Sequence, residues 1–337
     1  MKKYRVAVVG ATGAVGSTMM RVLAERQFPV SRLRALATAR SAGRELTWNG
    51  DAVVVEDVET FDFSEVDIAL FAGGEIASEV YGPRARDAGV VVIDNSATFR
   101  MDPDVPLVVP EVNPHALEGH RGLIANPNCS TIQMVVALAP LKPAGLKRVL
   151  VSTYQSVSGT GLPAIEELEG QVRSWAAGEP FTQPSVYPRR IAFNLLPHIG
   201  SFGEDGFTGE ERKMILETQK ILEMPALRVS ATCVRVPVRY SHSESVHVET
   251  DRPLSPQQAR EWLSRAPGVK VMDEPDRAVY PTALDGEDQD LVLVGRIRKD
   301  PSVEHGIQMW VVADNLRKGA ASNAIQIAET LIQQGKL

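Results

Sequence analysis

The chain has 337 residues, of which 44% are hydrophobic and 23% charged, with a formal net charge of −6. This length favours two domains of about 150 residues each, and the ordinary composition excludes a disordered or fibrous protein. The acidic balance argues against a nucleic-acid partner, and no apolar run approaches the roughly 18 residues that would indicate a membrane span.

The amino terminus, MKKYRVAVVG, predicts a buried strand rather than a signal peptide, because glycines soon interrupt the apolar run and no cleavage pattern follows. A cytoplasmic location is therefore expected. The two cysteines, Cys129 and Cys233, are expected to be free thiols, since a cytoplasmic chain keeps its cysteines reduced.

The first 130 residues alternate short apolar runs with helical segments. Strands are predicted at 4–10, 32–38, 66–74 and 90–96, and helices at 15–27 and 77–89. Strands that alternate with helices are typical of βαβ units. This part of the chain therefore predicts an α/β domain whose parallel sheet is covered on both faces.

The pattern changes near residue 131. Helices are predicted at 132–141, 163–178 and 208–224, and strands at 146–159, 230–240, 243–251 and 306–315. The last three strands alternate with period two, which favours a mixed or antiparallel sheet with one covered face. A final amphipathic helix at 319–335 is expected to return to the first domain. The predicted domains are 1–130 plus 317–337, for dinucleotide binding, and 131–316, for catalysis and dimerisation.

A glycine-rich loop follows the first strand. Glycines there allow a tight turn and a close approach of backbone to pyrophosphate at a helix N-terminus. The expected cofactor contacts in this loop are Gly10, Thr12, Gly13, Ala14, Val15 and Gly16. A glycine turn without a ligand is the alternative interpretation.

The end of the second strand indicates which dinucleotide binds. An NAD site usually carries a carboxylate about 20 residues beyond the glycines, but Arg40 and Ser41 stand there. A cation and a hydroxyl suit a 2′-phosphate, so NADP is favoured over NAD. The alternative is that Arg40 is a solvated surface side chain.

Cys129 lies in NPNCST, directly before an apolar helical run. Asn126 or Asn128 is expected to cap that helix. In the first turn, the helix dipole and the free N–H groups favour a thiolate and would also hold an oxyanion. The residues alone leave a packed cysteine as the other interpretation. Cys233, inside an alternating strand, is predicted to serve packing only.

Motifs along the whole chain resemble those of aspartate-β-semialdehyde dehydrogenases, in the order of that family. The matching segments are VGATGAVG, LATARSAG, VVIDNSATFRMD, VPEVNP, ANPNCSTIQMV, TYQSVSGTG, TGEERKM, RVPVRYSHSESVHVE and VVADNLRKGAASNAIQIAE. NPNCST also differs from the GCYPT of N-acetylglutamyl-phosphate reductases and the SCTT of glyceraldehyde-3-phosphate dehydrogenases.

The resemblance implies NADP-dependent, reversible conversion of β-aspartyl phosphate to aspartate β-semialdehyde and phosphate through a cysteine thioester, in lysine, threonine and methionine biosynthesis. It also implies a Rossmann-type domain, an α+β catalytic and dimerisation domain with a mixed sheet, and no metal. A homodimer is expected, with a dimer of dimers as the alternative.

The same resemblance assigns roles to particular residues. Cys129 is the expected nucleophile and His242 the expected acid and base. Three residues are expected to bind the substrate: Gln155, Glu210 and Arg235. Two cations are expected to bind phosphate: Arg100 and Lys213. Three further residues are expected to contact the cofactor: Ser158, Gly159 and Asn315.

The spacing of these residues adds two constraints. Glu210 and Lys213 are three apart and share a helix face, so a solvated intrahelical ion pair is the alternative to substrate binding. Arg235, expected to oppose the apolar face of its strand, is seven residues from His242. On one straight strand the two side chains would face opposite ways, so a turn near Tyr240 must bring them together.

Two other functions remain open from the sequence. One is reduction of an N-acylated glutamyl phosphate, and the other is a non-catalytic dinucleotide-binding paralogue. The NPNCST motif and Glu210, placed for a free ammonium group, weigh against the first. The presence of Cys129, His242 and Arg235 weighs against the second.

Overall fold

The computed structural model describes residues 2–337, which form two compact units. The first unit contains the residues up to Asn128 together with Ala320–Leu337, and the second contains Cys129–Gly319. Among the helices of residues 2–337, none combines the length and the apolar character needed to cross a bilayer.

The first unit is built on a seven-stranded sheet with the order β3-β4-β2-β1-β5-β6-β7. Its strands are β1 (Tyr4–Val9), β2 (Val30–Ala37), β3 (Glu45–Trp48), β4 (Asp51–Asp57), β5 (Ile68–Phe71), β6 (Val91–Asp94) and β7 (Leu123–Ala125). All neighbouring strands pair in parallel except β3 and β4. The predicted α/β domain with a parallel sheet is confirmed.

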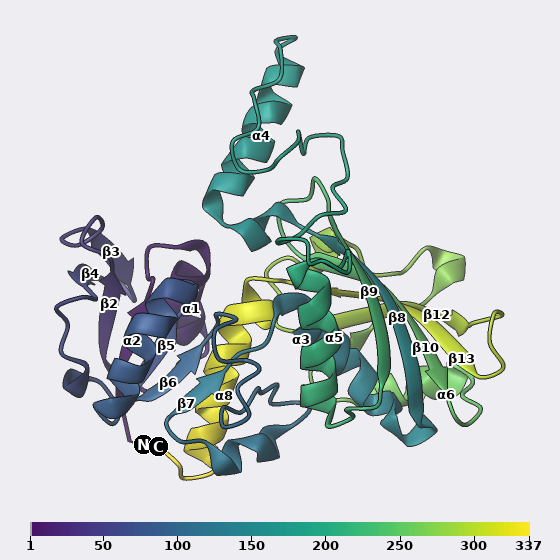
Figure 1. The fold of residues 1–337 in the computed structure, drawn as a ribbon, viewed down its shortest axis with the longest axis horizontal. Helices are drawn as coiled ribbons and strands as arrows, with labels where there is room; N and C mark the ends of the chain where they lie inside the picture. Colours follow the sequence, from purple (N-terminus) through teal and green to yellow (C-terminus); the bar gives the residue numbers. More distant parts are fainter. Residues whose placement is uncertain (1) are drawn as a thin grey trace. The chain divides into compact units, whose positions relative to one another are not determined.

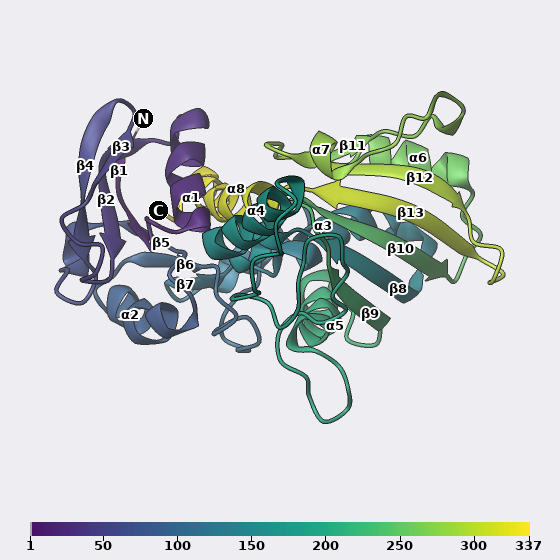
Figure 2. The same ribbon diagram turned by 90° about the horizontal axis from the view of Figure 1, so that it is seen from above.

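Helices cover both faces of this sheet (Figure 2). α1 (Ala14–Glu25) and α8 (Ser322–Gln333) pack together on one face, and α2 (Glu75–Asp87) covers the other. Leu23 of α1 and Ile325 of α8 belong to the same apolar cluster, and each is at most 1% exposed. Burial of one such side chain contributes about 1.5–3 kcal/mol, which explains why the last helix returns to this unit. The two chain ends meet here, where Tyr4 Oη donates to the carbonyl of Leu337 at 3.2 Å.

The second unit contains a six-stranded mixed sheet with the order β11-β12-β13-β10-β8-β9 (Figure 1). Its strands are β8 (Leu146–Gln155), β9 (Arg228–Arg235), β10 (His242–Thr250), β11 (Val269–Val271), β12 (Val292–Lys299) and β13 (Gly306–Ala313). β8 pairs with β9 in parallel and with β10 in an antiparallel manner. The predicted mixed sheet is confirmed.

Helices in this unit pack against the sheet or extend from it. α3 (Cys129–Leu138) lies against β10 and β13, α5 (Gly209–Leu222) against β9, and α6 (Pro256–Ser264) against β11 and β12. α4 (Leu162–Ala176) projects as an arm with a small apolar cluster of its own, whereas α7 (Ala283–Gly286) is a single turn beside β13.

Two predicted strands of the second unit were too long. The run at 230–240 leaves the sheet after Arg235, because Pro237 has no N–H for a ladder hydrogen bond. The run at 146–159 ends at Gln155 and continues as a 3₁₀ turn over Val157–Thr160. The ends of these two strands lie side by side and form the centre of the candidate site.

Candidate active site

Cys129 is the first residue of α3 and the only partly exposed one in that helix, since Ser130–Leu138 are all buried. The apolar run fixes the helix in the core and leaves only its first residue, Cys129, partly exposed. The helix dipole places partial positive charge at this end, which favours a thiolate or an oxyanion there.

The expected capping role of Asn126 is wrong. Its Nδ2 donates to Asn95 Oδ1 at 2.8 Å, and its Oδ1 accepts from Asn323 Nδ2 at 2.7 Å, so the amide is committed within the first unit. Asn128 is the residue that directly precedes the helix. Asn126 therefore fixes the approach of the chain to α3 rather than the helix end itself.

His242 is the first residue of β10 and is 0% exposed. Ser156 faces its Nδ1 with a backbone N–H and with Oγ, each at 3.1 Å. Because a backbone N–H can only donate, Nδ1 is the acceptor in this contact, and the proton of the neutral ring lies on Nε2. Burial, followed by the charge of Arg235, lowers the pKa of His242 well below its ordinary value. The imidazole is thus neutral near pH 7.

Arg235 and His242 are brought together across the end of β8. The chain leaves β9 at Arg235, pairs with the 3₁₀ turn through Val157 N–H to the carbonyl of Val238, and enters β10 at His242. A left-handed residue, Ser241 with φ of 67°, makes the final bend. A turn near Tyr240 is therefore present, as the spacing required.

Gly159 marks where the two side chains meet. A Cβ built on Gly159 would lie 2.9 Å from Arg235 Nη1 and 3.3 Å from His242 Nε2. Only a residue without a side chain fits between these groups. Arg235 is 5% exposed and donates from Nη1 to the carbonyl of Ser156 at 2.7 Å, so one nitrogen of its guanidinium is anchored to the backbone. The face of β9 that carries Arg235 and Cys233 is the buried one, contrary to the expectation of an apolar valine face.

Gln155, Glu210 and Lys213 form a connected group. Gln155 Nε2 donates to Glu210 Oε1 at 3.1 Å, and Lys213 Nζ lies 3.7 Å from Glu210 Oε2. The intrahelical ion pair is therefore present, and its carboxylate is buried, since Glu210 is only 7% exposed, whereas the Lys213 side chain is 36% exposed. A buried carboxylate beside a buried amide is suited to recognise a polar ligand.

Asn315 connects the segments around the histidine. Its Oδ1 accepts from Ser156 Oγ, Ser158 Oγ and the backbone N–H of Ser241, at 3.0–3.1 Å. The side chain is 3% exposed. These hydrogen bonds fix the 3₁₀ turn and the bend before His242 relative to each other.

Gly319 was missed by the sequence analysis. A Cβ at this position would lie 2.8 Å from the Cβ of Cys129 and 3.3 Å from its Cα. Gly319 belongs to a π-helical turn over Arg317–Ala321. In the sequence it is only a glycine between Lys318 and Ala320 in a helical run. Nothing in the sequence indicates why a glycine is needed there.

The glycine loop of the first unit fits a dinucleotide. Gly10 has φ of 83°, and a Cβ on it would lie 2.7 Å from the backbone of Ala72 and Gly73. A Cβ on Gly16 would lie 2.1 Å from the carbonyl oxygen of Gly10. α1 begins after Gly13 without a side-chain cap or an acidic residue in its first turn, so its N–H groups are open to a phosphate. The loop follows β1, at the point where the strand order reverses.

The other predicted residues of the first unit differ in exposure. Arg40 is exposed and Ser41 half-buried just beyond β2, where they are accessible to a ligand. Arg100 is 7% exposed, and its guanidinium donates to the carbonyls of Asn126 and Asn95 at 2.9 and 2.6 Å. Arg100 is thus oriented by backbone oxygens.

Two family models match the two parts of the chain. Residues 5–120 match "Semialdehyde dehydrogenase, NAD binding domain", and residues 138–318 match "Semialdehyde dehydrogenase, dimerisation domain". Together with the glycine loop and the histidine–arginine site, these matches define a dinucleotide-dependent oxidoreductase of the semialdehyde dehydrogenase class.

Full-length relatives specify the family further. The aspartate-semialdehyde dehydrogenase of Aquifex aeolicus is 54% identical over 98% of this chain and 99% of its own. The structure of aspartate semialdehyde dehydrogenase II complexed with ASA from Vibrio cholerae has a TM-score of 0.96 and 50% identity, covering 99% of both chains. The structure of the Candida albicans enzyme with NADP has a TM-score of 0.79 and 26% identity, covering both chains completely. The chain belongs to the aspartate-semialdehyde dehydrogenase family, as its motifs predicted.

Proposed function

We propose that the protein converts β-aspartyl phosphate to aspartate β-semialdehyde and phosphate, reversibly and with NADP, through a thioester on Cys129. The observation that carries the proposal is a pair of buried nitrogens without a hydrogen-bond partner among residues 2–337: Arg235 Nε and His242 Nε2. Leaving buried polar atoms unpaired costs free energy, so such atoms mark a place where a polar ligand completes the site.

The groups on the second unit suggest the following steps, written in the direction from aspartate β-semialdehyde to β-aspartyl phosphate. The Cys129 thiolate attacks the aldehyde carbon, and the first-turn N–H groups of α3 stabilise the resulting oxyanion. His242 is proposed to exchange the hydroxyl proton of the thiohemiacetal through Nε2, while its Nδ1 accepts a hydrogen bond from the backbone N–H of Ser156. Bound NADP supplies the acceptor for the hydride. Phosphate then attacks the thioester carbonyl, and the thiolate leaves.

Substrate recognition uses the buried charges around Gly159. The planar guanidinium of Arg235 is suited to a bidentate contact with the α-carboxylate. Glu210 is the proposed partner of the α-ammonium group, and Gln155, which donates to Glu210, would orient the substrate. Lys213 and Arg100 are the proposed phosphate ligands, because two cations stabilise the charge that develops on the phosphate oxygens.

The first unit is proposed to bind NADP in preference to NAD. The pyrophosphate would lie over the glycine loop, at residues Gly10, Thr12, Gly13, Ala14, Val15 and Gly16, and the 2′-phosphate would meet Arg40 and Ser41. Ser158, Gly159 and Asn315 are the proposed contacts at the nicotinamide end. The cytoplasmic location expected from the sequence stays a prediction.

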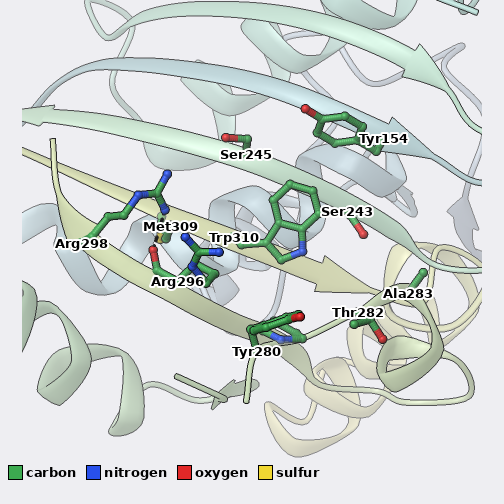
Figure 3. A pocket seen from close by; sticks show the side chains of 11 residues that line it. Tyr154, Ser243, Ser245, Tyr280, Thr282, Ala283, Arg296, Arg298, Met309 and Trp310 are labelled. Carbon is green, nitrogen blue, oxygen red and sulfur yellow. Dashed lines mark hydrogen bonds between the residues drawn. The ribbon is translucent and has the colours of Figure 1, made fainter. Parts of the chain in front are cut away.

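We also propose a homodimer formed through the second sheet. Ser243 and Ser245 alternate with His242 and Glu244 on β10, so they lie on the face away from the site. Figure 3 shows this face, where the rings of Tyr154 and Trp310 are 5.3 Å apart in a cavity of about 470 Å³. Aromatic side chains and arginines are typical of interface centres, which favours a second copy as the occupant.

The proposed reaction is tested by NADPH formation from aspartate β-semialdehyde. Activity is expected to require phosphate and to disappear in Cys129→Ser, while Cys233→Ser, at a fully buried position, serves as the matched control. Turnover that is indifferent to phosphate, or strong turnover by Cys129→Ser, would contradict the thioester mechanism.

A further inference from the structure

Glu244 is a buried carboxyl that the proposed reaction does not use. It is 0% exposed, and neither carboxyl oxygen has a hydrogen-bond partner among residues 2–337. It stands two residues after His242 on β10, so both side chains leave the same face of the strand. An ionised carboxylate in such a place would be very unfavourable, and a buried acid usually retains its proton instead.

Gln133 is a polar side chain close to this carboxyl, and its amide counteracts the rise in the pKa of Glu244. It lies four residues after Cys129 in α3, and therefore on the same helix face. Its Nε2 donates to the carbonyl oxygen of His242 at 3.4 Å. Because a carbonyl only accepts, this contact fixes the amide orientation and leaves Oε1 for other partners.

Gln133 Oε1 is itself buried without a hydrogen-bond partner among residues 2–337. The amide oxygen and a carboxylate are both acceptors, so neither is satisfied by the other unless a proton lies between them. A protonated Glu244 supplies that donor. Burial raises the pKa of Glu244 well above its usual range, and the nearby Gln133 amide opposes this only in part.

Neutral side chains stand beside Glu244 on the neighbouring strands. Across the sheet, Glu244 pairs with Thr153 on β8, which in turn pairs with Cys233 on β9. Burial raises the pKa of the Cys233 thiol, so the thiol is uncharged. Glu210 and Glu211 of α5 add negative charge, and α3 has no charged residue. Arg235, on β9, donates to the carbonyl of Ser156.

We propose that Glu244 is protonated in the folded protein and donates its O–H to Gln133 Oε1, which positions α3 and Cys129 against β10 and His242. Glu244 is thus a positioning residue that acts through the Gln133 amide. Its positioning role rests on the proposed functions of Cys129 and His242, whereas its protonation state does not, so the two parts are tested separately.

Infrared spectroscopy of the full chain at neutral pH tests the proton. The parent is expected to show the C=O band of a protonated carboxyl, and Glu244→Gln is expected to lose it. Glu167→Gln is the matched control, because Glu167 is also buried but accepts from Ser185 N–H, Ser185 Oγ and Val186 N–H. A carboxyl band that survives in Glu244→Gln would overturn the proposal. This result does not depend on which reaction the protein catalyses.

Kinetics of two substitutions test the positioning role. Glu244→Gln retains a donor for Gln133 Oε1 and is expected to keep kcat within about twofold of the parent, with the same pH profile. Glu244→Leu removes the donor and is expected to lower kcat by about tenfold with little change in KM, because the reacting groups lose their alignment. If Glu244→Gln is as impaired as Glu244→Leu, charge rather than positioning matters, and the proposal fails.

A double substitution separates this coupling from general damage to the fold. When Gln133→Leu is combined with Glu244→Leu, no polar atom of the pair is left unsatisfied. The loss in kcat is expected to be smaller than the product of the two single losses. Losses that multiply would show that the residues act independently and would overturn the coupling. The infrared result on Glu244→Gln stands even if a leucine variant does not fold.

Discussion

Replacement of Gly319 by alanine is expected to disturb the nucleophile without touching any reacting group. The added Cβ would lie 2.8 Å from the Cβ of Cys129. Ordinary carbon contacts are about 3.5–4.0 Å, so one partner must move by roughly 0.7 Å or more. The backbone at Gly319 does not require glycine, since it is not among the residues with positive φ. The effect therefore isolates the close contact.

The displacement sets the size of the expected effect. A shift of about 1 Å in a reacting group costs up to about a hundredfold in rate, so Gly319→Ala is expected to lower kcat by roughly 10- to 100-fold. Overpacking costs about 1–3 kcal/mol, which the better helix propensity of alanine offsets by about 0.5–1 kcal/mol. Stability should therefore fall by no more than about 2.5 kcal/mol.

The assays are NADPH formation, alkylation of Cys129 by iodoacetamide, and urea unfolding. Gly170→Ala is the matched control: this glycine lies inside α4, and a Cβ there would meet Thr182 Oγ1 at an ordinary 3.7 Å. The control should retain parent activity and gain slightly in stability. A Gly319→Ala variant with the kcat and alkylation rate of the parent would refute the argument that this contact holds Cys129 in place.

Three further outcomes are expected. Iodoacetamide should label Cys129 and spare Cys233 in the folded protein, because Cys233 is 0% exposed and burial raises the pKa of its thiol; mass spectrometry of labelled peptides would contradict this if Cys233 reacted first. Arg40→Ala should raise KM for NADPH by about tenfold and leave KM for NADH unchanged, and an equal effect on both would remove Arg40 from the 2′-phosphate site. Burial alone would raise the pKa of Asp300, but Ser302 and His247 outweigh it and hold the pKa at about 2, below the usual 3.8. The stability that this carboxylate contributes is present above pH 3.8 and lost as the pH falls through about 2. Urea unfolding of Asp300→Asn should therefore show its deficit at pH 7 and little deficit near pH 2, and a deficit that is constant with pH would refute the assignment.

The sequence could predict the fold class because its strands are strongly patterned. Apolar runs that alternate with helices gave the parallel sheet, and the period-two segments gave the mixed one. It could not predict where β9 and β8 end, since the alternation of valines continues past Arg235 while Pro237 and the 3₁₀ turn at Val157–Thr160 end the pairing. Short strands such as β7 (Leu123–Ala125) carry too few residues to show a period.

The sequence could predict only those residues of the candidate site that belong to recognisable motifs. The segments NPNCST and RYSHSES identified Cys129 and His242, but nothing in them places Gly159 between Arg235 and His242. That contact depends on three strands meeting at the end of β8. Gln133 and Glu244 were likewise missed, because a glutamine in an apolar helix and a glutamate in an alternating strand look like exposed residues until the helix is packed on the sheet.

The thioester on Cys129 is tested most directly by a reaction without phosphate. Mixing the protein with aspartate β-semialdehyde and NADP in rapid-mixing absorbance measurements should give a burst of about one NADPH per subunit and then stop, since the acyl group has no acceptor. Mass spectrometry of the quenched mixture should find that acyl group on the peptide that contains Cys129. Continued turnover without phosphate, or a burst with Cys129 unmodified, would contradict the mechanism.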